Sequence, residues 1–192
     1  LEGEPFECPM RPWGGLEQVA FSPDGKTIAY TCRKKVGKEY ALSTNSDIYL
    51  YNIADKTVQN ISQGIMGYDQ NPVFSNNGKY IVWESMEHDG YESDKQRIML
   101  YDLESGERKD LTANLDQTCY SYTWSDDDSK IYFISPFMGT REIFVYNFAD
   151  QSFKQVTKDL HDINAYEIKG DKIYAQEVSM SRPAEIFVYD IN

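Results

Sequence analysis

The amino-acid sequence predicts an all-β fold, a β-propeller built from four-stranded antiparallel blades, and three observations carry this prediction. A hairpin motif returns at intervals of 53, 50 and 42 residues, a run of strand-forming residues follows each copy, and a short closing segment follows three of the runs. Self-similarity at such a period is typical of solenoids, propellers and arrays. Two hairpins per repeat make four strands, which is the blade of a propeller.

The returning motif reads as a strand, a tight turn and a second strand. Its four copies, of which the last is the most worn, occupy residues 21–30, 74–83, 124–133 and 166–175. Ser22 can hydrogen-bond back to the turn backbone, and Pro23 presets the φ angle of the turn. We expect Gly25 to take the left-handed position of the loop. Asp128 replaces this glycine in the third copy, and aspartate visits that region more readily than most residues.

A second hairpin is expected after each copy of the motif. Near-continuous runs of apolar, aromatic and β-branched residues, which favour strands, occupy residues 47–53, 97–103, 142–148 and 185–191. Short closing strands are predicted at residues 57–62, 108–112 and 153–157. The blades then cover about residues 16–65, 66–115, 116–160 and 161–192, with the last strand of the fourth blade missing.

Residues 1–15 are expected to form an extended lead-in, because they contain Pro5, Pro9 and Pro12. Prolines remove the amide donors that a strand needs, so this segment is a poor substitute for the missing strand. We therefore expect about four blades in an incomplete, open ring. Open sheet edges and faces favour pairing with other chains, so self-association through exposed blade edges is predicted.

The composition restricts the partners of the protein. A formal net charge of −12 argues against nucleic acid and anionic membranes, which need basic surfaces. Cys8, Cys32 and Cys119 are too few and too scattered for a disulfide framework or a zinc cluster, and we expect Cys32 and Cys119 to be buried in strands. Residues 126–128, three aspartates, lack the ligand spacing of a calcium loop. We predict no cofactor and no metal.

The sequence offers no catalytic residue. A serine hydrolase of the α/β class would need a Gly-x-Ser-x-Gly elbow, and no such pentapeptide occurs. The two histidines, His88 and His161, have no serine or cysteine nucleophile in a recognisable motif. We expect both to be ordinary loop histidines.

One group of carboxylates is a candidate binding site. Two connections, residues 33–46 and 86–96, are longer than a hairpin needs, and long loops on a repeat scaffold usually carry contacts. Glu84 precedes the second of these loops, and Glu87, Tyr91 and Glu92 lie within it. Such carboxylates can hold a substrate ammonium group by charge-assisted hydrogen bonds. The alternative is a solvated loop.

The repeats resemble the Ser-Pro-Asp-Gly propeller repeats of periplasmic TolB-like proteins and of prolyl-oligopeptidase-family serine peptidases. More specific segments look like the dipeptidyl-peptidase 5 and acylaminoacyl-peptidase branch of that family; they occupy residues 11–15, 30–35, 43–51 and 85–95. The resemblance implies an N-terminal propeller that caps a C-terminal α/β-hydrolase domain. That domain would hold the catalytic triad, while the propeller would restrict entry to short peptides and help to position their N-termini.

The resemblance does not extend to every family feature. In the related dipeptidyl peptidase IV branch, a Glu-Glu pair of the propeller holds the substrate amine. Here Tyr91-Glu92 is followed by Ser93, so the pair is not reproduced.

Two functions are compatible with these motifs and this resemblance. The first is a non-catalytic propeller segment of a serine exopeptidase, with two partners: a C-terminal α/β-hydrolase domain of the same polypeptide, and short peptide substrates. The parent protein would be an enzyme, and this segment alone would not. The alternative is a TolB-like propeller that acts as a protein-binding module. The resemblance favours a periplasmic or secreted location and leaves the cytoplasm open.

Overall fold

The computed structural model describes residues 4–11 and 14–191 of the 192-residue chain. These residues form fifteen strands, the short 3-10 helix η1 (Leu16–Gln18) and the short helix α1 (Gly37–Leu42). The chain divides into two compact units, Leu1–Leu115 and Asp116–Asn192. Across the described part of the chain, no helix is long and apolar enough to cross a membrane.

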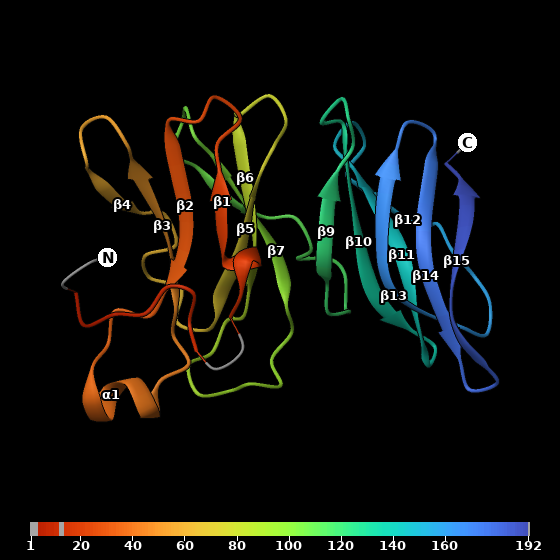
Figure 1. The fold of residues 1–192 in the computed structure, drawn as a ribbon, viewed down its shortest axis with the longest axis horizontal. Coiled ribbons are helices and arrows are strands. Elements are labelled where there is room, and N and C mark those ends of the chain that lie inside the picture. Colours follow the sequence, from red (N-terminus) through yellow and green to blue (C-terminus); the bar gives the residue numbers. More distant parts are fainter. Residues whose placement is uncertain (1–3, 12–13, 192) are drawn as a thin grey trace. The chain divides into compact units, whose positions relative to one another are not determined.

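The first unit contains two four-stranded antiparallel sheets, each with its strands paired in chain order (Figure 1). One sheet consists of β1 (Val19–Phe21), β2 (Thr27–Cys32), β3 (Asp47–Asn52) and β4 (Val58–Asn60). The other consists of β5 (Asp69–Phe74), β6 (Tyr80–Ser85), β7 (Arg97–Asp102) and β8 (Arg108–Asp110). The predicted unit of two hairpins per sheet is thus confirmed.

The second unit repeats this pattern and then extends it. Its first four strands are β9 (Tyr120–Trp124), β10 (Lys130–Phe137), β11 (Thr140–Asn147) and β12 (Ser152–Gln155). Three further antiparallel strands follow, β13 (Asp162–Lys169), β14 (Lys172–Ser179) and β15 (Arg182–Asp190). A parallel pairing of Arg141 in β11 with Asp162 in β13 joins both groups into one sheet.

The turns of the repeated motif have the conformation that the sequence predicts. Gly25 adopts a φ of 70°, and its N–H donates to the carbonyl of Ser22 at 2.9 Å. The Ser22 hydroxyl in turn accepts from the Thr27 N–H at 2.9 Å. In the third copy Asp128 takes the same left-handed position, with a φ of 57°. A residue that tolerates positive φ is what this loop requires.

The closing strands are shorter than predicted, because a side chain ends each ladder. In the first sheet the Ser62 hydroxyl accepts from the Ile48 N–H at 2.9 Å, where the main chain of a longer β4 would otherwise bond. Thr157 does the same for Ile143 at 2.9 Å. A Ser or Thr hydroxyl competes well with a backbone acceptor, so β4 and β12 end early.

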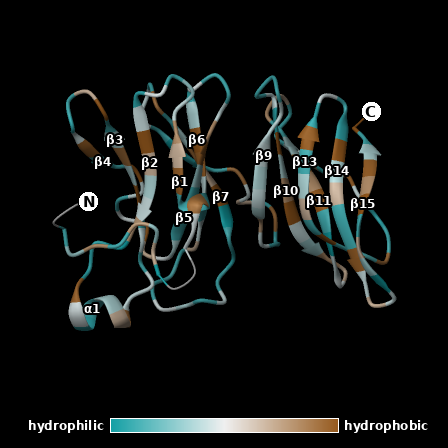
Figure 2. Cartoon of the chain, in the orientation of Figure 1, coloured by the Kyte–Doolittle hydropathy of each residue, from teal (hydrophilic) through white to brown (hydrophobic). Residues whose placement is uncertain are grey.

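Apolar side chains from the strands form the core of each unit, and Figure 2 shows brown, hydrophobic segments on the strands with teal, hydrophilic turns between them. In the first unit Trp83 is fully buried among Ile48 and Ile81. In the second, the Phe133 ring stacks on Phe144 with centroids 6.0 Å apart. Burial of such large side chains supplies most of the drive to fold.

Some features differ from the sequence predictions or lie outside the description. The polar connection 33–46 contains α1 rather than loop alone. All three cysteines are free, and Cys32 and Cys119 are buried, although Cys119 lies just before β9 rather than within it. Of the predicted lead-in, residues 1–3 and 12–13 lie outside the described residues. Near its end the Gly14 N–H donates to the Met10 carbonyl at 2.7 Å.

Candidate functional site

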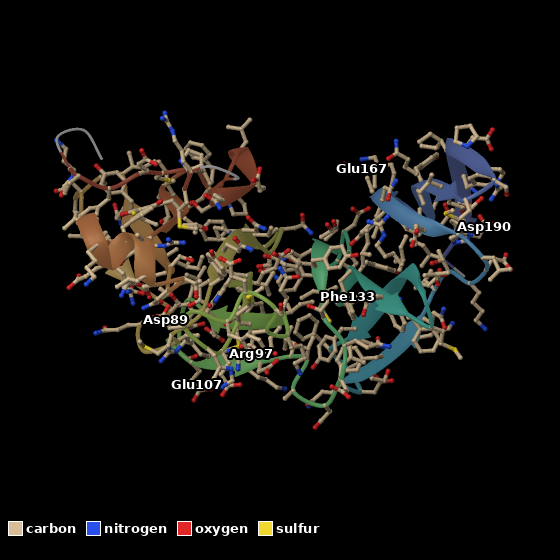
Figure 3. The ribbon with its side chains drawn as sticks, turned by 90° about the horizontal axis from the view of Figure 1, so that it is seen from below. Asp89, Arg97, Glu107, Phe133, Glu167 and Asp190 are labelled. Carbon is tan, nitrogen blue, oxygen red and sulfur yellow. The ribbon has the colours of Figure 1, made fainter. Side chains whose placement is uncertain are left out.

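The two long connections of the first unit lie at the same end of its strands. Antiparallel pairing places the short hairpin turns at one end of the two sheets and the connections 33–46 and 86–96 at the other (Figure 1). Helix α1 marks this end in Figure 1. Figure 3 views the strands from this side and labels Asp89, which lies within the second connection, and Arg97, which directly follows it. We call residues 86–96 the acidic loop.

Asp94 folds the acidic loop onto itself. Its carboxylate accepts from the N–H groups of Glu87 and His88, each at 2.9 Å, and contacts Nδ1 of His88 at 2.9 Å. Burial by itself raises the pKa of the Asp94 carboxyl, but these hydrogen bonds outweigh it and lower the pKa to about 2. Asp94 is therefore ionised at neutral pH and already satisfied by its own loop.

The structure places three of the four predicted site residues together and separates the fourth. Glu87, Tyr91 and Glu92 lie on the acidic loop, and all three are exposed. Glu84 lies inside β6, is only 6% exposed and accepts from Nδ2 of Asn71 at 3.1 Å. Glu84 thus belongs to the interior of the sheet rather than to the loop surface.

The predicted site residues on the loop differ in whether a neighbouring side chain already interacts with them. Glu87 forms an ion pair with Arg97 at 3.5 Å. Tyr91, which is 56% exposed, presents its ring to His88 with centroids 6.5 Å apart. Glu92 makes no hydrogen bond or ion pair with any residue that the structure describes. Chemically, Glu92 is the carboxylate best able to accept a ligand's ammonium group.

The first connection adds cations and aromatic rings to the same end of the unit. The Arg33 guanidinium lies over the Tyr40 ring at 4.7 Å and over the Tyr68 ring at 5.6 Å. The Lys34 ammonium lies 4.0 Å from the centre of the Tyr49 ring. Cation–π contacts of this kind hold the basic side chains against aromatic rings.

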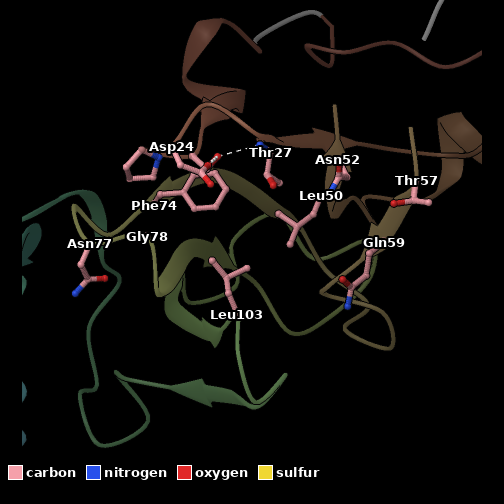
Figure 4. A pocket seen from close by; sticks show the side chains of 12 residues that line it. Asp24, Thr27, Leu50, Asn52, Thr57, Gln59, Phe74, Asn77, Gly78 and Leu103 are labelled. Carbon is pink, nitrogen blue, oxygen red and sulfur yellow. Dashed lines mark hydrogen bonds between the residues drawn. The ribbon is translucent and has the colours of Figure 1, made fainter. Parts of the chain in front are cut away.

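A cavity of about 440 Å³ lies at the opposite end of the first unit, among the hairpin turns. Figure 4 shows polar side chains, among them Asp24, Asn52 and Asn77, around its mouth, with Leu50 and Phe74 among the apolar residues. None of the four predicted site residues lines it. The cavity and the acidic loop are therefore separate features.

The second unit contains a buried ionic cluster that the sequence analysis missed. The prediction that His161 is an ordinary loop histidine is wrong: its ring is 4% exposed and lies 3.5 Å from Glu142 and 3.4 Å from Glu177, both buried. Thr157 donates to Glu142 at 2.6 Å, and Tyr189 donates to Glu177. Burial raises the pKa of Glu177, against the charges of His161 and Arg182, which lower it.

Part of this cluster could have been predicted from the sequence repeat. Glu142 and Thr157 occupy the positions that Asp47 and Ser62 occupy in the first sheet, where the Ser62 hydroxyl also donates to the acid, at 3.2 Å. A cavity of about 460 Å³ opens beside His161 and Glu177. Within the described residues, no group of three or more His, Cys, Asp or Glu side chains could hold a metal ion.

Comparison with known proteins adds relatives of known class. No protein-family model matches the chain. The chain is 41% identical over 187 residues to dipeptidyl-peptidase 5 of Porphyromonas gingivalis; the match covers 97% of this chain and 27% of that protein. The chain thus spans about a quarter of the length of this curated relative.

Three solved structures share the fold. The β-propeller domain of the trilobed protease from Pyrococcus furiosus matches with a TM-score of 0.66 and 15% identity, over 91% of this chain and 49% of that one. Pyrococcus horikoshii acylaminoacyl peptidase matches with a TM-score of 0.69 and 19% identity, over 90% of this chain and 25% of that one. A TolB protein from Agrobacterium tumefaciens matches with a TM-score of 0.68 and 20% identity, over 91% of this chain and 61% of that one.

The two kinds of comparison agree with the architecture. The sheets repeat as propeller blades do, the solved neighbours include a propeller domain of a protease, and the sequence match spans almost the whole chain. The chain is therefore a β-propeller segment that is similar over almost its whole length to part of dipeptidyl-peptidase 5.

Proposed function

We propose that this chain is the non-catalytic N-terminal propeller segment of a serine exopeptidase. It gates and positions short peptides for a C-terminal α/β-hydrolase domain of the same polypeptide. The observation that carries the proposal is the 41% identity to dipeptidyl-peptidase 5 over 97% of this chain. The sequence itself holds no Gly-x-Ser-x-Gly elbow, which agrees with a non-catalytic role for this segment.

The acidic loop is the part of the segment that would receive the substrate amine. An N-terminal ammonium group needs an ionised acceptor that is not already occupied, and Glu92 is exposed and free of described partners. Tyr91 beside it offers an exposed ring to the first side chain of the peptide. Glu87 shares its charge with Arg97, and Glu84 is buried, so both would contribute less.

The enzyme assignment is tested by comparing this chain with the full-length protein that contains it. On dipeptidyl chromogenic substrates we expect no turnover by the chain alone and turnover by the full-length protein. Robust hydrolysis by residues 1–192 alone would overturn the assignment, because it would place the nucleophile within this sequence.

The amine site is tested by Glu92→Gln in the full-length protein. The variant keeps the shape of the side chain and removes its charge. A hydrogen bond to a charged group contributes about 1.5–3 kcal/mol, so KM for free-amine peptides should rise about tenfold to a hundredfold, with little change for N-acylated peptides. Glu104→Gln, at an exposed turn before β8, is the matched control. An unchanged KM in Glu92→Gln would dismiss the site.

The second candidate function is a TolB-like propeller that binds a protein partner. The TolB structure shares the fold, and at 20% identity that match concerns the fold alone. A full-length protein that hydrolyses none of the peptide substrates, yet keeps a folded propeller, would favour this candidate.

A further inference from the structure

The acidic loop needs an anchor if Glu92 is to have a defined position. Residues 86–96 contain no helix or strand, and Tyr91 and Glu92 are exposed. Asp94 ties the loop only to itself, through Glu87, His88 and Lys95. The ends of the loop are bonded to their surroundings, where the Met86 N–H donates to the Tyr68 carbonyl at 2.7 Å and Nζ of Lys95 donates to the Leu115 carbonyl at 3.0 Å. Its middle, which carries Tyr91 and Glu92, needs an anchor of its own.

Asp89 supplies a connection to the neighbouring blade. Its two carboxylate oxygens each accept from the Ser43 hydroxyl at 2.8 Å, and Oδ1 also accepts from the Thr44 N–H at 2.7 Å. The Asn45 N–H donates to the same oxygen at 3.2 Å. In the reverse direction, the Gly90 N–H donates to the Thr44 hydroxyl at 2.8 Å. These bonds link segments more than forty residues apart in sequence.

The chemistry of this junction suits a clamp. Residues 43–45 lie between the C-terminus of α1 and β3. The Ser43 N–H donates to the Glu39 carbonyl, whereas the Thr44 and Asn45 N–H groups donate to Asp89. Hydrogen bonds from neutral donors to a carboxylate are about twice as strong as those between neutral groups. Burial alone raises the pKa of Asp89, but the bonds from Ser43, Thr44 and Asn45 lower it below its ordinary value. The clamp is thus closed at neutral pH.

We propose that Asp89 is a positioning residue, which fixes the acidic loop against residues 43–45 so that Glu92 and Tyr91 meet the substrate in one place. The positioning role rests on the proposed function, whereas the hydrogen bonds of the clamp are independent of it. Oδ1 of Asp89 already accepts from the Thr44 and Asn45 N–H groups, and Ser43 shares its single hydroxyl proton between Oδ1 and Oδ2. Asp89 acts through Glu92 rather than by contact.

The clamp is tested first by hydrogen exchange on the full-length protein. In Asp89→Ala we expect the amides of Thr44 and Asn45 to exchange about tenfold faster or more, as hydrogen bonds to a charged acceptor are lost. The Gly90 amide, which donates to the Thr44 hydroxyl, should also exchange faster once the loop is released. Amides in the middle of β6 should keep their protection. Asp126→Ala, at an exposed turn of the second unit, is the matched control. Unchanged exchange at residues 44, 45 and 90 would overturn the clamp.

The positioning role is tested next by kinetics on the same variant. A displaced loop should raise KM for free-amine peptides by up to about a hundredfold, leave kcat nearly constant and spare N-acylated peptides. Asp89→Asn keeps one carbonyl acceptor for the Thr44 N–H, so it should restore part of the loss. A general folding defect would instead lower kcat for every substrate, and that result would overturn the positioning role.

Comparison with Glu92→Gln separates the two proposals. If Glu92→Gln raises KM and Asp89→Ala does not, although exchange increases, the amine site stands and the positioning role fails. If neither variant changes KM, the amine site itself is wrong, and the exchange data alone decide whether the clamp exists. If both raise KM for free-amine peptides selectively, both proposals are supported.

Discussion

Asp69 shows how one buried residue couples two sheets and gives stability a pH dependence. It is fully buried at the start of β5, where its N–H donates to the Ser46 carbonyl at 3.2 Å. Its carboxyl accepts from Nε1 of Trp83 at 2.7 Å. Burial raises the pKa of Asp69 to about 7, although hydrogen bonds from neighbouring side chains, Trp83 among them, lower it in part.

The sign of the resulting effect can be predicted. An unfolded aspartate titrates at about 3.9, so between pH 4 and 7 the folded chain holds the proton that the unfolded chain has lost. The free energy of unfolding therefore falls as pH rises through this window, by roughly 4 kcal/mol at most. Asp69→Asn should flatten that dependence. Urea unfolding at several pH values measures this dependence. If the free energy of unfolding changed equally with pH in the original protein and in Asp69→Asn, the prediction would be wrong.

At the scale of elements, local signals predicted most of the fold. Strand propensity and turn chemistry act over a few residues, so the central run 47–53 matched β3 (Asp47–Asn52) closely, and Gly25 and Asp128 took their expected conformations. Helix α1 was missed because six residues in a polar loop show no helical periodicity. The early ends of β4 and β12 depend on hydroxyl bonds to another strand, which local propensity does not contain.

The candidate site was predicted only in outline, for the same reason. The sequence shows that Glu87, Tyr91 and Glu92 share a loop, because this needs only their spacing. It does not show that Arg97 forms an ion pair with Glu87 or that the Ser43 hydroxyl donates a hydrogen bond to Asp89. The cluster around His161 was missed because its carboxylates come from separate strands, β11 and β14.

The junction between the two sheets of the first unit gives a prediction at this scale. A Cβ on Gly67 would lie 2.4 Å from the Met86 carbonyl oxygen, in a segment where the Met86 N–H donates to the Tyr68 carbonyl at 2.7 Å. Neither backbone can yield without breaking this contact. Gly67→Ala should therefore destabilise the protein by about 3 kcal/mol.

Gly25→Ala is the matched comparison for this substitution. A Cβ on Gly25 meets nothing within 4 Å, so only its positive φ carries a penalty, of about 1 kcal/mol. Urea unfolding of both variants measures the two costs. Equal losses of stability would show that the close approach at Met86 relaxes freely.

At the scale of the whole molecule, the surface combines a negative net charge with an apolar sheet edge. β15 pairs with β14 and with no other described strand. On one face of this edge Ile186 is 66% exposed and Val188 is 53% exposed, and Tyr174 lies opposite Val188 on β14. An edge of this length with exposed apolar residues is a template for pairing with another chain. The net charge of −12 opposes such pairing by repulsion.

We propose that the isolated 192-residue chain self-associates through β15 and that salt strengthens the association. At about 0.5 M salt the Debye length falls to a few ångströms, so repulsion weakens while burial of Ile186 and Val188 still drives contact. Light scattering should report a larger mass at high salt than at low salt, and Ile186→Lys should reduce it. Val36→Lys, which changes an exposed apolar residue of the first unit, should not. A monomer at every salt concentration would contradict the proposal, and equal losses in both variants would show that the contact lies elsewhere than β15.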